Sequence, residues 1–434
     1  FSLVSGQACE IEQVDKTFES LDTTSHSLTG EYAFDDEDSD ENVIKITHGY
    51  SKAHRPDLKQ VVQEIIVSQD GGIPLACKNW DGNSADTAIF KARSKALVDE
   101  FKKSQAPKYL VADCKLYHKS NAEFLSKIQF LTLVPSTISL EKASIRTAIA
   151  INQWVKIDDN YQYVVEEVNH MGIKQRWMVI YSKAANSRAQ KSIIRQVERA
   201  HTGIKKDLFH LQAQRFACQT DAQRALDKLA KKMKHHQIAT QQFIEHKVYE
   251  GKGRPKKDAP VKSIEWQITA EIEENETAIK QIVEQKSCFV LATNIDKEAL
   301  SPEDLLKHYK AQSEVEKGFR FLKDPLFFVS SLFIKKPSRI DALLMVMTLS
   351  LLVYSIAQRR MRANMKKEKA TIANQINKEI PNPTLRWVFQ CFEGINLLQQ
   401  GDKISLDGFD ELREKIIRLI GGHALHLYKI QKVT

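Results

Sequence analysis

Short runs of alternating apolar and polar residues fill the first third of the chain, and this pattern predicts strands separated by turns and helices. Three strands are predicted first, at 17–25, 42–51 and 72–80. They are followed by a helix at 84–103, a strand at 108–114, a helix at 120–128 and a strand at 129–135. Three strands, helix, strand, helix, strand is the order of a ribonuclease-H-like α/β core.

The pattern changes between residues 137 and 286, where a β-rich insertion is predicted. A hairpin is expected around the turn His170-Met171-Gly172. A long, highly charged helical stretch is then predicted over 186–248, and strands return at 263–273 and 288–294. The charged helices are expected to form a solvated arm or a dimer contact rather than a site.

A single amphipathic helix is predicted to reach Lys323, because Ser301 supplies an N-cap hydroxyl, Pro302 suits the first helical position and Pro325 stops the helix. At about 100° per residue, four polar side chains share a stripe about 60° wide. These are Tyr309, Gln312, Glu316 and Lys323. Glu316 is therefore expected at the edge of the packed face and Glu314 in solvent. The alternative is an ordinary solvated flank of a helix that packs in the core.

From residue 337 onward the pattern predicts mostly helix. The apolar run at 342–357 is short for a membrane span and contains three hydroxyl side chains, so a buried core helix is expected there.

Composition indicates the charge of the expected partner and the cellular compartment of the protein. Lys plus Arg number 64 against 55 for Asp plus Glu, a net charge of +9, which favours a polyanionic partner. The six cysteines contain no Cys-x-x-Cys pair, so neither a zinc ribbon nor a disulfide framework is indicated, and a reducing cytoplasm is expected. Residue 1 is Phe rather than Met, which predicts a missing upstream segment.

Three acids are candidates for a shared metal site. Asp22 lies in the first predicted strand, Asp113 ends the fourth, and Glu316 lies on the helix stripe. Neighbouring strands and a helix packed across them bring such carboxylates together, and hard oxygen ligands suit Mg²⁺ or Mn²⁺. Two such ions about 4 Å apart support an in-line phosphoryl displacement. In the alternative reading, Asp22 caps a turn and Asp113 caps the following helix.

The spacing Tyr309-x-x-Gln312-x-x-x-Glu316-x6-Lys323 resembles the Tyr-Arg-Glu-Lys signature of DDE transposases in the insertion-sequence-four family of bacterial insertion sequences. Further stretches resemble the same family: LDTTSHSLTG at Asp22, GYSKAHRPDLKQ from Gly49, GGIPLACKNWDGNSAD from Gly71 and YLVADCKLY around Asp113. The likeness extends from about residue 17 to 360, with 137–286 matched only in position and general character. Gln312 replaces the signature arginine, and its neutral amide can still donate to a phosphate oxygen.

The resemblance implies cut-and-paste DNA transposition, with Asp22, Asp113 and Glu316 as ligands of Mg²⁺, for which Mn²⁺ substitutes. In that family one metal site hydrolyses a strand at the element end and then uses the new 3′ hydroxyl for strand transfer. By position, four residues would hold phosphates near the scissile bond: Tyr309, Gln312, Arg320 and Lys323. The implied partner is double-stranded DNA, both element ends and target, bound by a homodimer in the bacterial cytoplasm at the nucleoid.

The division implied by pattern and resemblance together has four parts. The fold class is α/β, a ribonuclease-H-like catalytic core interrupted by a β-rich insertion with a helical excursion and followed by a helical C-terminal region. Residues 1–136 form the first part of the core, 137–286 the insertion, 287–336 the second part with the glutamate helix, and 337–434 the helical C-terminal region.

Further DNA contacts are predicted outside the acids. The basic segment 251–257, with Arg254 and Lys256, resembles a hook that lays an arginine into an A·T-rich minor groove; the alternative is a basic loop. Arg55 and Lys59 are candidates for phosphate contact, unless Arg55 and Asp57 only tie down a turn. Members of the family stack a flipped base on a tryptophan of the insertion, a role open here to Trp177 or Trp266.

Three other functions stay open from the sequence. The same fold suits a metal-dependent nuclease without strand transfer, including a Holliday-junction type of enzyme. A DNA-binding remnant without activity is the second alternative. A glycosidase with paired carboxylates is the third, and the basic charge balance argues against it.

Overall fold

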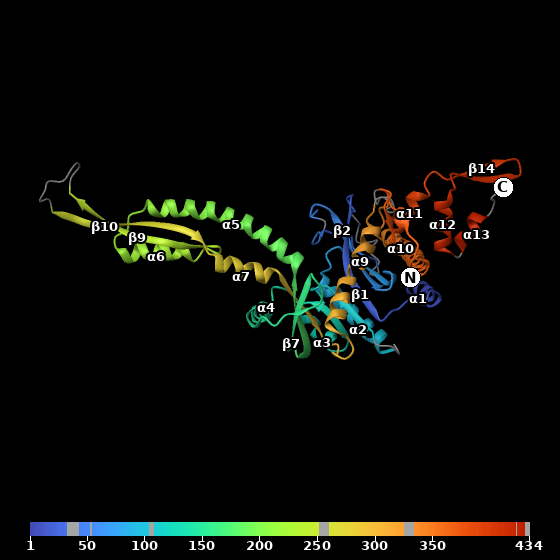
Figure 1. Ribbon diagram of the computed structural model, residues 1–434, viewed down its shortest axis with the longest axis horizontal. Helices are drawn as coiled ribbons and strands as arrows, with labels where there is room; N and C mark the ends of the chain where they lie inside the picture. Colours follow the sequence, from blue (N-terminus) through green and yellow to red (C-terminus); the bar gives the residue numbers. More distant parts are fainter. Residues whose placement is uncertain are drawn as a thin grey trace. The chain divides into compact units, whose positions relative to one another are not determined.

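The computed structural model describes residues 1–32, 43–52, 54–103, 108–250, 260–324, 334–421 and 423–429 (Figure 1). The chain divides into two compact units. The first contains 1–133, 167–176 and 292–434, and the second contains 134–166 and 177–291. The second unit thus begins after residue 133, whereas the sequence predicted that the insertion begins after residue 136. It ends at residue 291, whereas the predicted end of the insertion was residue 286.

The first unit is built on a mixed sheet. Five of its strands are β1 (Phe18–Leu28), β2 (Lys59–Ser68), β3 (Pro74–Trp80), β4 (Tyr109–Ala112) and β5 (Gln129–Leu133). They lie in the order β3-β2-β1-β4-β5; β1, β4 and β5 are parallel to one another, while β2 is antiparallel to both of its neighbours. Strands β2 and β4 are buried almost throughout, as expected for strands covered on both faces.

Helices pack on this sheet within the same unit. They include α1 (Ser2–Ile11), α2 (Asp86–Lys103), α3 (Ala122–Leu125), α8 (Pro302–Ala311), α9 (Ser313–Leu322) and α10 (Pro337–Glu368). Val315 and Phe319 of α9 join Ile65 of β2 and Leu351 of α10 in one buried cluster. The chain re-enters the unit at 292, where Asn294 accepts a hydrogen bond from the Phe130 amide of β5 at 2.9 Å. The helix that follows is thereby fixed to the sheet.

The predicted strand at 42–51 is wrong. Within the described part of that range only Thr47 makes a β-bridge, to Gln60, and the second strand is instead β2 at Lys59–Ser68. In its sequence KQVVQEIIVS apolar and polar residues come in short runs rather than in alternation, and every residue after Lys59 is buried, so the strand lacks the pattern that marks a half-exposed strand.

The second unit contains most of the insertion. It includes α4 (Ser139–Ile151), β6 (Val155–Lys156), α5 (Lys183–Gln212), α6 (Gln219–Ala230), β9 (His236–Tyr249), β10 (Val261–Glu274) and α7 (Glu276–Lys286). The unit boundaries fall within β7 (Tyr161–His170), β8 (Ile173–Ser182) and β11 (Cys288–Thr293). Strands β7 and β8 form the predicted hairpin, with positive φ at Met171 and Gly172, as a two-residue hairpin turn requires.

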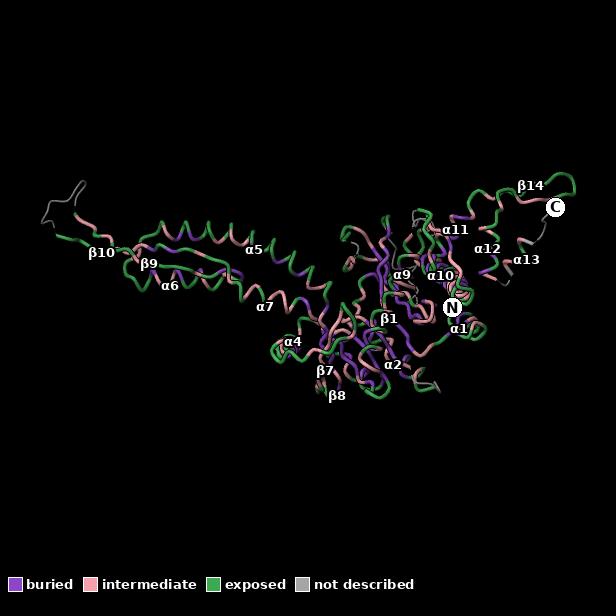
Figure 2. The backbone as a smooth tube through the Cα atoms, in the orientation of Figure 1, coloured by how far each residue is buried: buried purple, intermediate pink, exposed green. Residues whose placement is uncertain are grey.

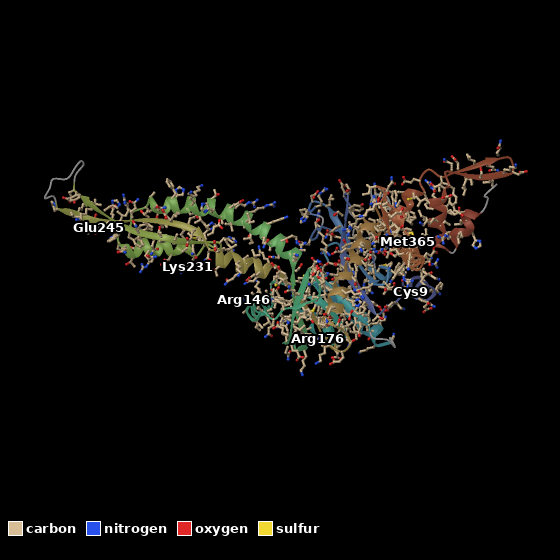
Figure 3. The ribbon with its side chains drawn as sticks, in the orientation of Figure 1. Cys9, Arg146, Arg176, Lys231, Glu245 and Met365 are labelled. Carbon is tan, nitrogen blue, oxygen red and sulfur yellow. The ribbon has the colours of Figure 1, made fainter. Side chains whose placement is uncertain are left out.

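The helical prediction over 186–248 is correct only as far as α6. Residues 236–248 belong to β9, which pairs antiparallel with β10 along a long two-stranded ribbon. The polar side chains of β9, Glu245 among them (Figure 3), resemble those of the preceding helices, so the sequence pattern did not predict a strand. The strand is stabilised by pairing with β10, which lies later in the sequence.

The C-terminal part of the first unit is helical with two small hairpins. Helix α10 is followed by β12 (Ile372–Ala373), β13 (Glu379–Ile380), α11 (Leu385–Cys391), β14 (Asn396–Gln400), β15 (Lys403–Asp407), α12 (Glu411–Ile420) and α13 (His423–Lys429). By length and composition α10 could cross a membrane; in the structure its residues Leu344, Leu351 and Met365 lie in separate buried clusters. The expected core helix at 342–357 is thus part of α10.

Candidate active site

Two carboxylates come from neighbouring positions of two parallel strands: Asp22 lies inside β1, and Asp113 follows directly after the carboxyl end of β4. In the register of β1 with β4, Leu21 pairs with Ala112, so Asp22 and Asp113 each follow directly after a paired residue. Strand β4 ends at Ala112 while β1 continues, which leaves the edge of the sheet open beside Asp22. Because neighbouring strands lie about 4.8 Å apart, the two carboxylates share one site.

The pKa values of both acids reflect burial and proximity. Burial, followed by the charge of Asp113, raises the pKa of Asp22 to about 6, against opposing effects of the Thr23 amide, Lys52 and Lys115. Burial also raises the pKa of Asp113, although its carboxylate accepts the Lys115 amide at 3.0 Å. The sites therefore disfavour two negative charges without a compensating cation.

A third acid, Asp86, lies beside this pair, and the sequence analysis did not select it. Its carboxylate accepts the Thr23 hydroxyl at 2.5 Å, lies 3.3 Å from the Lys52 ammonium and forms an ion pair with Lys115. Burial opposes its ionisation, but these hydrogen bonds and cations keep the pKa of Asp86 below its usual value. Asp86 is thus a stable anion that holds two lysines near Asp22 and Asp113.

Lys52 is tied to the first strand as well. Its ammonium donates to the Thr23 carbonyl at 2.7 Å and to the Thr23 hydroxyl at 2.8 Å, and burial lowers its pKa. Asp86 closes the stretch from Gly71, and Lys52 lies in the stretch from Gly49. Both stretches carry the family resemblance, so the sequence marked these segments as functional. It did not single out Asp86 or Lys52 within them.

The predicted single helix through Tyr309 and Lys323 is wrong. It is divided at Gln312, which separates α8 from α9. Glu316 is exposed, whereas Glu314, expected in solvent, is half-buried with its carboxylate 2.6 Å from the Lys317 ammonium. The exposure of the two glutamates is therefore the reverse of the expectation.

Tyr309 links the helices to the strand carboxylates. Burial raises its pKa to about 12, and the charges of Cys114, Asp113 and Glu316 act in the same direction. Burial lowers the pKa of Lys323, the charge of Lys52 adds to this effect and the charge of Asp22 opposes it. Electrostatic proximity thus places Tyr309 near Asp113 and Glu316, and Lys323 near Asp22.

Arg320 lies in a different environment from the one expected. It lines a cavity of about 450 Å³ in the first unit together with Lys317, Arg362 and Arg386. Glu314 and Asp324 line the same cavity, and Asp324 forms an ion pair with Arg386. This cavity is bounded by α9 and α10 rather than by β1 and β4.

Two of the acids are suited to binding a divalent metal ion. Asp22 and Asp113 supply adjacent hard oxygen donors whose mutual repulsion a cation would relieve, so these two residues fit Mg²⁺ or Mn²⁺. Among the residues that the structure describes, no three His, Cys, Asp or Glu side chains are grouped closely enough to hold one ion. Glu316 therefore does not complete a three-carboxylate cluster with Asp22 and Asp113 in this structure.

The residues predicted to contact DNA elsewhere have varied surroundings. Arg55 is exposed and ion-paired with Asp57 at 2.6 Å, as in the turn-stabilising alternative. The Lys59 ammonium donates to the carbonyls of Glu31 and Tyr32, so its charge is partly engaged. Arg254 and Lys256, with the whole segment 251–257, lie outside the described residues.

The two tryptophans differ in burial. Trp177 is 0% exposed, so its ring offers no face to a flipped base, which corrects its inclusion among accessible candidates. Trp266 is half-buried on β10, where it packs beside the cluster that contains Leu226 and Ile268. Of the two, only Trp266 retains accessible surface.

Comparisons with known proteins add a family and one solved structure. The family described as transposase DDE domain matches residues 20–353. No curated protein matches the chain. A solved structure, the piggyBac transposase synaptic complex with hairpin DNA determined by cryo-EM, is similar with a TM-score of 0.33 and 7% sequence identity, over 79% of this chain and 48% of that chain. The chain thus spans about half the length of that transposase.

Proposed function

This chain belongs to the transposase DDE domain family, and we propose from that premise that it cuts and joins DNA at the ends of an insertion sequence by metal-dependent phosphoryl transfer. The observation that carries the proposal is that Asp22, inside β1, and Asp113, directly after β4, both follow the paired residues Leu21 and Ala112 of two parallel strands. The strand order β3-β2-β1-β4-β5, with β2 alone antiparallel to its neighbours, supports a ribonuclease-H-like layout for the core.

In this proposal Asp22, Asp113 and Glu316 hold the divalent ions, and Mn²⁺ substitutes for Mg²⁺. DDE domains generally use such ions, which activate the attacking oxygen and stabilise the leaving oxygen of an in-line displacement. Glu316 is on the exposed side of α9, four residues after Gln312, and a small movement of α9 is the step proposed to bring it to the pair.

The remaining residues of the site bind and orient the phosphate. Lys52 and Lys115, held by Asp86, present ammonium groups beside the carboxylates and offset the charge of the incoming phosphodiester. Lys323, whose pKa responds to the charge of Asp22, supplies a further cation. Tyr309 remains a neutral hydroxyl at physiological pH because its pKa is about 12, so it donates a hydrogen bond to a phosphate oxygen.

The test uses DNA taken from either side of the coding sequence. A supercoiled plasmid carrying both flanks is incubated with the protein and Mg²⁺ or Mn²⁺, and cleavage is mapped to the nucleotide. A second reaction supplies pre-cut ends with free 3′ hydroxyls and a target plasmid. The proposal predicts metal-dependent cleavage at the element ends and joined product from pre-cut ends.

The outcomes separate the alternatives. Cleavage without joined product indicates a nuclease of the same fold, and binding without either reaction indicates an inactive remnant. Asp113→Asn is the matched variant, because it removes one charge with little change in volume. It is expected to keep end binding and to lose cleavage by at least about 100-fold, since even residues that only orient metal ligands are worth 10- to 100-fold.

A further inference from the structure

Helix α5 of the second unit has two opposite faces. Five of its side chains are buried: Ala189, Ile193, Val197, Leu208 and Leu211. They pack toward β10, α6 and α7, and Leu208 and Leu211 share a buried cluster with Leu226 of α6 and Ile268 of β10. In Figure 1 the helix runs alongside the β9–β10 ribbon, and Figure 2 shows exposed backbone along the side of α5 that faces away from it.

The face opposite the buried side chains is basic. At about 100° per residue, five cationic side chains fall within a sector about 80° wide, and the buried side chains lie on the other side of the helix axis. The α5 basic stripe consists of Arg188, Lys191, Arg195, Arg199 and Lys206, all exposed. Lys206 is 18 residues beyond Arg188, so the stripe is about 27 Å long.

The cations of the stripe form none of the ion pairs found in the described part of the second unit. The ion pairs of the described part of the second unit join other residues: Lys156 with Asp159, Arg224 with Asp221, Lys262 with Glu250, and Lys280 with Glu284. Arg188, Arg195 and Arg199 line a shallow depression on the α5 surface together with Ser192 and Gln196. Guanidinium and hydroxyl donors thus converge on one open strip that lacks a carboxylate.

We propose that the α5 basic stripe binds the phosphate backbone of a DNA duplex, away from the cleavage site. A stretch of B-form DNA about 27 Å long carries about 16 phosphates, a charge density that the stripe complements without needing base contacts. The inference rests on the proposed function only in naming DNA as the polyanion. An acidic surface of a second copy of the chain is the competing occupant.

The experiment compares two double variants with the same loss of charge. Arg195→Gln with Arg199→Gln removes the centre of the stripe. Arg224→Gln with Lys280→Gln removes two exposed cations of the same unit that already have carboxylate partners. Binding of a labelled duplex of arbitrary sequence, about 30 base pairs long, is measured by fluorescence anisotropy from about 50 to 200 mM salt without divalent metal.

The stripe variant is expected to bind about 10-fold more weakly at 100 mM salt, and its slope of log K against log salt becomes less steep by about 2, because two phosphate contacts are lost. The control keeps the wild-type slope. The inference is overturned if both variants match the wild type, or if both weaken binding equally. It is also overturned if the stripe variant loses self-association in sedimentation while its salt slope is unchanged, since the stripe then serves a second copy.

Failure of this inference differs from failure of the proposed function. If the wild type cleaves element ends but the stripe variant binds like the wild type, only the stripe assignment falls. If the wild type shows no metal-dependent cleavage while the stripe variant still loses salt-dependent binding, the catalytic proposal falls and the stripe assignment stands.

Discussion

Asp22 and Asp113 lie side by side because β1 and β4 are parallel and in register, with Leu21 opposite Ala112 immediately before them. Neither acid is solvated like a surface carboxylate, and the charge of Asp113 helps to raise the pKa of Asp22 to about 6. The pair therefore costs folding free energy when both members are ionised and no cation is present.

This repulsion predicts opposite effects of Asp113→Asn on stability with and without metal. Without divalent ions the variant is expected to be more stable than the wild type by about 1 kcal/mol, because one buried charge is removed. With Mg²⁺ or Mn²⁺ the wild type gains stability by binding the ion, and the variant gains much less. Urea unfolding at pH 7.5, with and without metal, measures both effects.

Asp296→Asn is the matched control, because Asp296 is an exposed acid of the same unit. It is expected to leave both the metal-free stability and the metal-induced gain unchanged. If metal stabilises Asp113→Asn as much as the wild type, Asp113 is not a ligand.

Asp86 gives a second prediction through its two lysines. In Asp86→Asn the ammonium groups of Lys52 and Lys115 lose a shared, largely buried anion. Removing one partner of a buried ion pair typically costs several kcal/mol, and with the lysines partly exposed a loss of about 2 kcal/mol is expected in urea unfolding.

A matched control removes an exposed partner instead. Asp159→Asn breaks the surface pair with Lys156, in which both side chains are mostly exposed, and is expected to leave stability unchanged. Equal effects of the two variants would show that Asp86 is no more than a surface acid.

Much of the site followed from sequence, but its fine geometry did not. Asp22 and Asp113 were identifiable because each lies at a predictable strand position. The break at Gln312 was not, since an ideal helical projection assumes a straight helix and Gln312 has helical φ and ψ values in the structure. The exposure of Glu314 and Glu316 depends on that break, so it was predicted in reverse.

Contacts between residues far apart in the sequence were the second feature that the sequence pattern could not predict. Strand β9 carries charged and glutamine side chains typical of the helices before it, and only its pairing with β10 fixes it as a strand. Asp86 lies 64 residues beyond Asp22 in sequence, and its position becomes functional only through contacts with Thr23 and Lys52 from other elements. Nothing in the local sequence encodes those contacts.

Gly82 is predicted to be intolerant of any side chain. A Cβ at this position would overlap the carbonyl oxygen of Gln60 and lie 2.5 Å from that of Thr47, both in the backbone. Gly82→Ala is therefore expected to destabilise the protein by at least about 2 kcal/mol and to disturb the segment that leads into Asp86. Chemical denaturation measures the loss.

Gly203 provides the contrasting control. It lies within α5, where a Cβ would meet nothing within 4 Å. Gly203→Ala is expected to stabilise the protein by about 0.5 to 1 kcal/mol, because alanine favours the helix. If both substitutions change stability in the same direction, the crowding assigned to Gly82 is wrong.

His26 predicts a loss of stability in mild acid. It is buried on β1, its Nε2 lies 3.0 Å from the Gln63 side-chain oxygen, and burial lowers its pKa to about 4. In the unfolded chain the pKa of histidine is about 6.5, so between these values the unfolded state binds a proton that the folded state does not. Stability is therefore complete above about pH 6.5 and falls as the pH drops toward 4.

The expected loss from this residue is about 2 kcal/mol between pH 7 and pH 5. His26→Gln keeps a polar side chain but does not titrate, so the difference in unfolding free energy between it and the wild type should shrink by that amount over the same range. A difference between His26→Gln and the wild type that stays constant over this range would show that His26 takes up a proton equally in both states, and the prediction would be wrong.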